Sequence, residues 1–359
     1  MKIVMMNMMM MMSGKTKNNK KMKEYKQNVP NLEISEKERN SSIKLMESIF
    51  KVQSTSGNME AMSSFIYNFV DNLVDPTIDI RSDKSGNIYV TKGRADTYPC
   101  IVSHIDTVHD IIPEQDYLVL NNGLEFFAID VGLKRPTGIG GDDNNGIYCC
   151  LDNLIREDYI KLAFFVDEEI GCVGSSACDM KFFEDVSFVL QADRQGYNDV
   201  VNNIGGTVMF GNDFWDSISD TLDDYSRTVT SGGMTDVMQL AHNGLEVAMA
   251  NFSCGYYKPH TDKEYVVIDE LILTSLLFRD IIKSSYTNGL VNEFTREPAD
   301  IYGYSNSNKF TDYQWFGKEN KSNVKQSNPD CTYCGGKLEY DESTDAYYCF
   351  GCLDYDINY

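Results

Sequence analysis

The sequence is poor in positive charge. Its 359 residues hold 32 Lys and Arg against 54 Asp and Glu, which gives a formal net charge of -22. Proteins that bind nucleic acid through its phosphates need clustered Lys and Arg. The deficit therefore argues against nucleic acid as a partner, whereas a large negative charge favours solubility and attracts cationic groups.

Long apolar runs are also lacking. No stretch of 18 or more apolar residues occurs outside the methionine-rich start, so no transmembrane helix and no membrane partner are expected. The run 3–12 weakly resembles a signal peptide, but it has no small-x-small cleavage site and a lysine-rich stretch follows it. A disordered, low-complexity tail over 1–34, or a wrongly assigned start codon, fits these features better.

No disulfide framework is expected from the ten cysteines. Six are scattered through apolar surroundings, which indicates buried free thiols in a reducing, cytoplasmic compartment. The other four form two Cys-x-x-Cys pairs, Cys331 with Cys334 and Cys349 with Cys352. Four thiolates at this spacing predict a closed, structural zinc site in a small zinc ribbon at 331–359. A redox role for the pairs is the alternative.

Helical and strand patterns alternate along most of the chain. Helical patterns cover 36–51, 58–74, 143–157 and 268–285, and short apolar runs that indicate buried strands cover 99–103, 161–166, 186–191 and 247–252. Alternation of this kind predicts an α/β fold with a central sheet of mostly parallel strands. We expect this domain to span 35–285, and we interpret the polar segment 286–330 as a linker or a strap over the core.

Metal-binding side chains follow these four strands. In chain order they are His104, Asp106, Glu168, Glu169, Asp193 and, after a short loop, His260. In open α/β sheets, ligands and chemistry sit beyond the carboxyl ends of the strands, so we expect these side chains to gather at one edge. Carboxylate oxygens and imidazole nitrogens are zinc ligands. The set therefore predicts a zinc site, with two zinc ions side by side.

Six short motifs occur in the order in which one enzyme family has them. They are Ser103-His104-Ile105-Asp106-Thr107, Gly141-Asp142-Asp143, Asp167-Glu168-Glu169-Ile170-Gly171, Asp193, Gly232-Gly233-Met234-Thr235-Asp236 and His260-Thr261-Asp262-Lys263-Glu264. Over roughly residues 38–285 the chain resembles the co-catalytic zinc peptidases of the peptidase T, carboxypeptidase G and acetylornithine deacetylase/succinyl-diaminopimelate desuccinylase type, and peptidase T most closely. The resemblance implies a three-layer α/β/α catalytic domain.

The resemblance also implies a role for each ligand. His104 and Asp193 would bind the first zinc, and Glu169 and His260 the second. Asp142 would bridge the two ions, because one bidentate carboxylate can span two cations. Taken singly, each residue also fits a simpler role: a hydrogen-bonded core histidine, an acidic helix start or a helix cap.

Two further acids would complete the centre. Asp106 would hold the imidazole of His104 and fix its tautomer. Glu168 would be the general base, which takes a proton from the metal-bridging water and passes it to the leaving nitrogen. Zinc would lower the pKa of that water toward about 7. Four nearby residues are not expected to bind metal: Asp143, Asp236, His109 and His242.

The chain departs from the family after Asp193. Relatives insert a lid and dimerisation domain there, whereas only the segment 194–231 is present here, and a monomer is therefore expected. No histidine lies between 194 and 241 to replace the one that the lid lends to the substrate carbonyl. Ser231 and Asn144 stand where relatives often carry arginine and lysine. We hypothesise that the missing polar contact comes from Arg227, Tyr256 or Tyr257.

The predicted function is hydrolysis of amide bonds in short peptides by an exopeptidase of the aminopeptidase or tripeptidase type. It would use two active-site zinc ions, besides one structural zinc in the ribbon. An amidohydrolase that deacylates N-acyl amino acids is the alternative with the same metal chemistry. A catalytically silent, zinc-containing binding protein is the alternative outside the enzymes, and the intact Glu168 argues against it.

Overall fold

A computed structural model describes residues 34–287, 290–291, 294, 339–341, 346–349 and 354–356. The chain divides into two compact units, Met1–Gly303 and Tyr304–Tyr359. The tail predicted at 1–34 lies outside the described residues, apart from its last residue. Within the described part of the chain, every helix is too short or too polar to cross a membrane.

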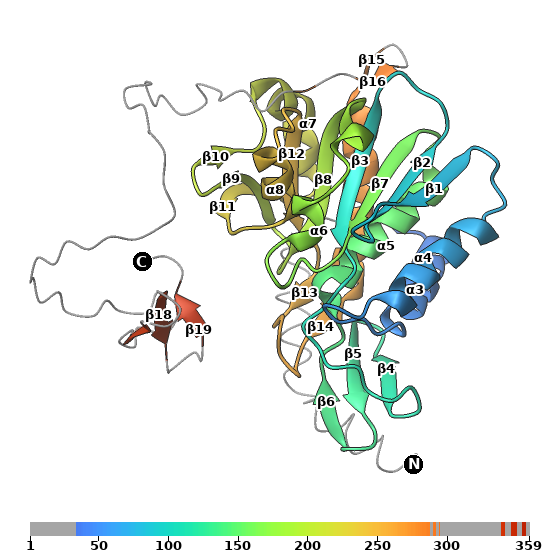
Figure 1. Cartoon of the computed structure of the whole chain (residues 1–359), viewed down its shortest axis with the longest axis vertical. Helices are drawn as coiled ribbons and strands as arrows, with labels where there is room; N and C mark the ends of the chain where they lie inside the picture. The colour runs from blue at the N-terminus through green and yellow to red at the C-terminus, as the bar shows by residue number, and fades with distance from the viewer. Residues whose placement is uncertain are drawn as a thin grey trace, which may run out of the picture. The chain divides into compact units, whose positions relative to one another are not determined.

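The first unit is built on a mixed sheet in the order β1-β2-β7-β3-β8-β12-β9-β10, with β11 paired to β9 (Figure 1). Its strands are β1 (Ile78–Ser82), β2 (Ile88–Lys92), β3 (Tyr98–His104), β7 (Ile160–Phe165), β8 (Val186–Arg194), β9 (Asp199–Ile204), β10 (Thr207–Val208), β11 (Thr228–Gly232) and β12 (Ala248–Ser253). The central strands β7, β3, β8 and β12 run parallel, and the pairs at both edges include antiparallel ones. The central strands are buried on both faces, and their sequences are therefore continuous apolar runs.

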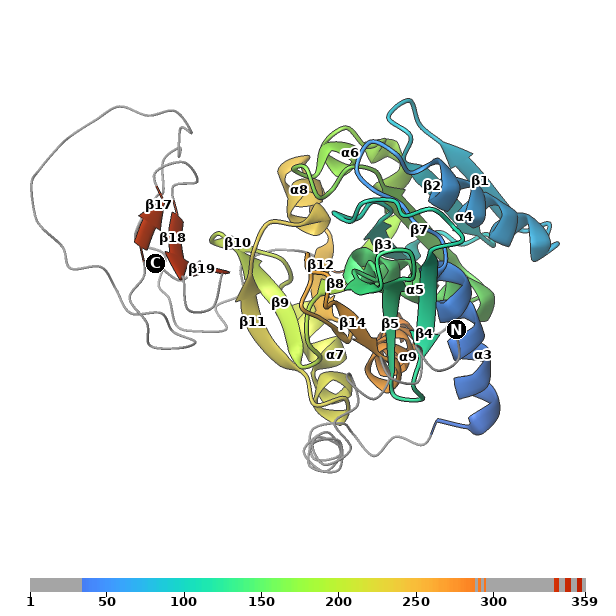
Figure 2. The ribbon, with the colours of Figure 1, turned by 90° about the horizontal axis from the view of Figure 1, so that it is seen from below.

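Helices cover both faces of this sheet (Figure 2). They are α3 (Glu36–Phe50), α4 (Glu60–Asn72), α5 (Gly141–Arg156), α6 (Val173–Ser176), a 3-10 turn η1 (Met180–Phe183), α7 (Asn212–Asp224), α8 (Asp236–His242) and α9 (Ile268–Ser284). The helix α5 packs on β3, β8 and β7 with α9 and α3 beside it, while α8 contacts β3 and β12 from the other face with α6 against it. The predicted three-layer α/β/α architecture is confirmed.

Local sequence explains where the first helices begin and end. The Ser35 hydroxyl accepts a hydrogen bond from the backbone N of Glu38 at 3.2 Å, which caps the first turn of α3. The helix α4 ends shortly before Asp75-Pro76, where proline cannot continue a helix. The predicted ranges for these helices differ from the observed ones by at most two residues at each end.

A second, five-stranded sheet lies next to the edge of the first at which its parallel strands end (Figure 1). It has the order β13-β14-β5-β4, with β6 paired to β5. Its strands are β4 (Tyr117–Asn121), β5 (Glu125–Asp130), β6 (Arg135–Thr137), β13 (Tyr256–Tyr257) and β14 (Tyr265–Val267). The sequence predicts only the β4–β5 hairpin, whose Asn-Asn-Gly tip is confirmed: the Asn122 side chain accepts hydrogen bonds from the backbone N of Leu124 and of Glu125.

The segment that replaces the expected lid is a small extension of the main sheet. The sequence predicts a strand pair within 203–212 and a helix at 214–224; the structure has the pair β9–β10 somewhat earlier and the helix α7 as expected. The strand β11, which runs parallel to β9, is not predicted. Its sequence Thr-Val-Thr-Ser-Gly is half exposed and carries no long apolar run.

The chain stays attached to the core beyond the predicted domain end at residue 285. The short strands β15 (Tyr286–Thr287) and β16 (Leu290–Val291) pair, and Phe294 is buried with its ring 5.1 Å from that of Phe214 and 5.9 Å from that of Phe188. Its backbone N also donates to the carbonyl of Ser187 at 3.2 Å. The boundaries proposed from the sequence stay predictions.

The second unit contains a small antiparallel sheet, β17-β18-β19. Its strands are β17 (Glu339–Asp341), β18 (Ala346–Cys349) and β19 (Asp354–Asp356). Cys349 ends β18, while Cys331, Cys334 and Cys352 lie outside the described residues. The ribbon zinc therefore stays a prediction. The six cysteines within 34–287 are free thiols, and five of them are buried, as expected.

A buried carboxyl on α9 makes stability depend on pH. Glu270 accepts a hydrogen bond from the Tyr257 hydroxyl at 2.7 Å, and its burial raises its pKa to about 7. This value lies above the ordinary glutamate pKa of about 4.3, so the folded protein binds the proton more tightly than the unfolded chain does. The contribution of this proton to the free energy of unfolding is fully present below about pH 4.3 and is lost as the pH rises through about 7.

Glu270→Gln removes this titration and keeps an acceptor for Tyr257. At pH 8 the variant is expected to exceed wild type in free energy of unfolding, by on the order of 3 kcal/mol at most. The difference should shrink as the pH is lowered toward 5. Urea denaturation at both pH values measures it, and a variant less stable than wild type at pH 8 would contradict the assignment.

Candidate metal centre

The predicted ligands come from strand ends and from two loops. His104 is the last residue of β3, Asp193 lies near the end of β8, and Glu169 follows β7. Because these strands are parallel, their carboxyl ends meet at one edge of the sheet. Asp142 belongs to the first turn of α5, and His260 to the loop between β13 and β14. The structure brings all five side chains together.

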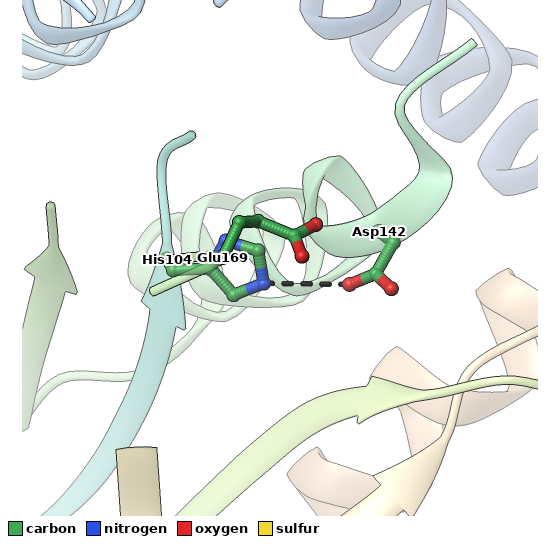
Figure 3. Close-up of side chains that lie close together, drawn as sticks. All are labelled: His104, Asp142 and Glu169. Atoms are coloured by element: carbon green, nitrogen blue, oxygen red, sulfur yellow. Dashed lines mark ion pairs between the residues drawn. The ribbon is translucent and has the colours of Figure 1, made fainter. Parts of the chain in front are cut away.

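Asp142 lies between the two imidazoles. Its Oδ1 is 3.3 Å from Nε2 of His104, and its Oδ2 is 3.4 Å from Nε2 of His260. Figure 3 shows His104 and Glu169 pointing toward Asp142 from separate segments of the chain. One carboxylate thus presents a different oxygen to each of two nitrogen donors, which is the arrangement that a bridging ligand requires.

The first half of the centre contains His104 and Asp193. Asp193 Oδ1 is 3.7 Å from Nε2 of His104, and its Oδ2 accepts hydrogen bonds from the Thr235 hydroxyl at 2.8 Å and the Gln191 amide at 3.2 Å. His104 is fully buried, and its Nε2 has no hydrogen-bond partner among the described residues. A buried nitrogen without a partner is unfavourable unless something else binds it.

The second half contains Glu169 and His260. Nε2 of His260 is 3.1 Å from Oε2 of Glu169, and Oε1 of Glu169 is buried without a hydrogen-bond partner in the described part of the chain. Nitrogen and carboxylate donors with unpaired buried atoms fit a divalent cation in each half, because zinc binds such donors. Two subsets of the cluster, His104-Asp142-Glu169 and His104-Asp143-Asp193, have ligand atoms within 4.8 Å of one another.

The pKa shifts in the cluster also indicate that its carboxylates are stabilised by positive charge. Burial raises the pKa of Asp193, and the nearby charge of Asp142 adds to this rise. Burial would also raise the pKa of Asp142, but its contacts with His104 and His260 outweigh that effect and lower it. Contacts with Asp142 and Glu169 raise the pKa of His260 to about 10. The carboxylates thus strongly favour cationic neighbours.

Asp106 contacts both the imidazole of His104 and the backbone of Glu168 and Glu169. The Nδ1 atom of His104 lies 3.0 Å from the backbone O of Asp106 and 3.4 Å from its Oδ1. The same carboxylate accepts hydrogen bonds from the backbone N of Glu168 at 2.9 Å, from that of Glu169 at 3.2 Å and from the Ser56 hydroxyl at 2.7 Å. Burial alone would raise its pKa, but the contact with His104 outweighs it and lowers the pKa to about 2.

Glu168 lies beside the cluster without entering either half. Its Oε2 is 4.0 Å from Nε2 of His104, and its Oε1 accepts a hydrogen bond from the Cys172 thiol at 3.3 Å. Burial raises its pKa above the ordinary glutamate range. A carboxyl with a raised pKa next to the ligands can both accept a proton and return it near neutral pH.

The four neighbours that are not expected to bind metal have other partners or positions. Asp143 accepts hydrogen bonds from the Ser103 hydroxyl at 2.7 Å and from the backbone N of Gly146 at 2.9 Å. Asp236 accepts one from Gln191 at 3.3 Å, and burial raises its pKa to about 7. His109 binds Glu264, and His242 is exposed at the end of α8.

Arg227 does not fit the substrate-binding hypothesis. It is only 5% exposed, and its guanidinium donates to the backbone O of Tyr197 and of Ser253 and to the Thr274 hydroxyl. It also stacks 3.9 Å from the centroid of the Tyr197 ring. An arginine enclosed in this way ties β12 and α9 to the segment before β9 and presents no face to a substrate.

The two tyrosines of that hypothesis differ in position. The Tyr257 hydroxyl donates to Glu270, so it is directed toward α9. Tyr256 is buried beside Gly141, where an added Cβ would come within 2.8 Å of Tyr256 Cβ. Burial raises the Tyr256 pKa, and the charges of Asp142 and Asp193 raise it further. Of the two tyrosines, only Tyr256 therefore lies next to the cluster.

Several residues that orient the ligands are not predicted from the sequence. Thr235 and Gln191 bind Asp193, Ser56 binds Asp106, and Glu264 binds the backbone N of Asp142. Thr235 and Glu264 stand within the quoted motifs, which was a usable signal. Ser56 and Gln191 carry none, because hydroxyl and amide side chains are common in loops and strands.

No protein-family model matches the sequence, and no curated protein matches it. Solved structures do. Aminopeptidase PepT from Bacillus cereus ATCC 10987 is 15% identical with a TM-score of 0.56, over 68% of this chain and 98% of that one. A tripeptidase from Staphylococcus aureus subsp. aureus Mu50 is 13% identical with a TM-score of 0.54, over 68% and 98%.

An aminopeptidase from the archaeon Desulfurococcus kamchatkensis is 17% identical with a TM-score of 0.51, over 70% of this chain and 99% of that one. The chain therefore has the α/β fold of these aminopeptidases. Identity this low establishes the fold, while the activity has to be argued from the site.

Arg227→Met tests whether this arginine is structural. The variant leaves two buried carbonyls without their donor, so the free energy of unfolding is expected to fall by about 2–4 kcal/mol. Arg81→Met is the matched control, because Arg81 pairs with Asp179 at a half-exposed position and should cost about 1 kcal/mol or less. Denaturant unfolding measures both. An unchanged stability together with a raised KM for substrate would restore the substrate-binding hypothesis.

Proposed function

We propose that the protein is a metal-dependent hydrolase that cleaves amide bonds of short peptides, as an aminopeptidase or tripeptidase with two co-catalytic zinc ions. One observation carries the proposal: the two oxygens of Asp142 face the Nε2 atoms of His104 and His260, at 3.3 and 3.4 Å. The fold shared with solved aminopeptidases supports it.

Each ion would have its own pair of ligands besides Asp142. His104 and Asp193 would hold the first ion, Glu169 and His260 the second, and Asp142 both. The buried atoms without partners, Nε2 of His104 and Oε1 of Glu169, fit this assignment. When bound, zinc polarises a carbonyl and lowers the pKa of a bound water toward about 7.

Glu168 would act as the general base. Its carboxylate takes a proton from the attacking water as the water oxygen bonds to the scissile carbonyl carbon. It then returns that proton to the nitrogen of the leaving amine as the C–N bond breaks. Its contact with the Cys172 thiol and its position beside His104 hold the carboxyl next to the cluster.

The surroundings of the cluster suit a cationic substrate end. The protein carries a net charge of -22, and such an excess attracts a free peptide amino terminus. A cytoplasmic monomer with a structural zinc ribbon completes the proposal.

Glu168→Gln separates chemistry from binding. The variant keeps the size and hydrogen-bonding capacity of the side chain but cannot accept a proton, so kcat on a tripeptide is expected to fall by about 10²–10⁴-fold. The bound zinc, measured by atomic absorption, should stay at the wild-type amount. Residual activity close to wild type would rule out Glu168 as the base.

Digestion of a mixed library distinguishes the substrate classes. Short peptides and N-acyl amino acids are incubated with the zinc-loaded wild-type protein and with Glu168→Gln, and the products are identified by mass spectrometry. We expect wild type alone to shorten peptides from one end. Release of acyl groups alone would establish the deacylase, and zinc content without any product would establish the silent binding protein.

A further inference from the structure

The buried carboxylate of Glu264 binds the backbone on both sides of Gly141, directly before Asp142. The Glu264 side chain is fully buried. Its Oε2 accepts a hydrogen bond from the backbone N of Gly140 at 2.8 Å, and its Oε1 accepts one from the backbone N of Asp142 at 3.1 Å. Glu264 therefore fixes the backbone on either side of Gly141, immediately before the Asp142 side chain.

His109 is the third partner of this carboxylate. Its Nε2 lies 2.8 Å from Oε2 of Glu264. Because a carboxylate can only accept, the hydrogen bond requires the proton on Nε2 of His109. The ring lies so close to Gly138 that a Cβ there would come within 2.0 Å of it. This close approach explains the glycine at the start of the loop.

Glu264 also belongs to the segment that carries a proposed ligand of the second ion. It stands four residues after His260 and directly before β14, which pairs with β5 and β13. His260 itself has a positive φ of 59° and a side chain that is 52% exposed, so packing restrains it little. Within the loop the Thr261 hydroxyl donates to the carbonyl of Lys258 at 2.8 Å, and the Glu264 side chain then joins this segment to the start of α5.

The two halves of the centre therefore depend on different parts of the fold. His104 and Asp193 are held by the central strands β3 and β8. His260 stands on a loop, and its distance from Asp142 is set where that loop meets the start of α5. Glu264 makes that connection, and with both oxygens occupied by N–H donors it is not itself a ligand.

We propose that Glu264 is a positioning residue: through Gly140 and Asp142 it sets the spacing between His260 and the bridging carboxylate, and so prepares the second ion site. The inference rests on the two-ion centre of the proposed function. Its consequence is graded: loss of Glu264 disturbs both Asp142 and the segment of His260, so the second site should weaken more than the first, which shares only Asp142.

Glu264→Gln tests this selectivity. The amide offers one acceptor oxygen, and its NH2 group faces an N–H donor, so one of the two backbone anchors is lost. Zn²⁺ is titrated calorimetrically into the metal-free full-length protein, and the two ions in question are those besides the ribbon zinc, whose binding event Cys349→Ser removes. We expect the affinity for the second ion to fall about 10–100-fold, the usual effect of losing a group that orients a ligand, and the affinity for the first ion to fall by clearly less.

Glu270→Gln is the matched control. It makes the same change at a buried glutamate whose hydrogen bond goes to the Tyr257 hydroxyl and not to the backbone before Asp142. Both zinc affinities should equal those of wild type. His109→Ala provides a second route, since it removes one partner of Glu264 at a partly exposed position; a smaller loss in the same direction is expected, and this variant decides if Glu264→Gln does not fold.

The outcomes separate this inference from the function on which it rests. Wild type that binds two ions, with selective loss in Glu264→Gln, supports it. Wild type that binds two ions, with Glu264→Gln unchanged or weakened equally at both sites, overturns the positioning role alone. Wild type that binds fewer than two ions overturns the two-ion centre and the inference with it.

Discussion

The structure depends on how a crowded group of acids is balanced by positive charge. Asp142, Asp193, Glu168 and Glu169 lie around two imidazoles at the end of one sheet. Buried anions are costly unless they are paired or bind metal. The imidazoles meet part of this demand, and the proposed cations would meet the rest at the buried atoms that lack a hydrogen-bond partner among the described residues.

The acids of this region fall into two groups by their partners. Asp106, Asp143 and Glu264 each accept hydrogen bonds from backbone N–H groups, and through these bonds they shape the chain around the centre. Asp142 and Glu169 instead direct oxygens toward the imidazoles. The first group holds the backbone around the cluster. The second group has oxygens that could bind ions. Charge alone does not distinguish the groups; the position of each carboxylate relative to nearby amides does.

Much of the fold follows from patterns that are visible in the sequence. Apolar runs predict β3, β7, β8 and β12 because strands buried on both faces need continuous apolar side chains. Strand ends then predict where His104 and Asp193 meet, since parallel strands share an edge. The strands β11, β13 and β14 escape prediction. They are short, and their pairing comes from contacts with distant segments and not from local periodicity.

The case of Arg227 shows the limit of such reasoning. The sequence suggests this arginine as a contact for a substrate, yet the fold encloses it between two carbonyls and a hydroxyl from three segments. The sequence by itself determined the α/β architecture and the identity of the candidate ligands, because hydrophobic periodicity and donor chemistry are local properties. Only the tertiary structure decided which acids keep free oxygens and which bind backbone amides, because those partners lie far away along the chain, as Glu264 does from Gly140.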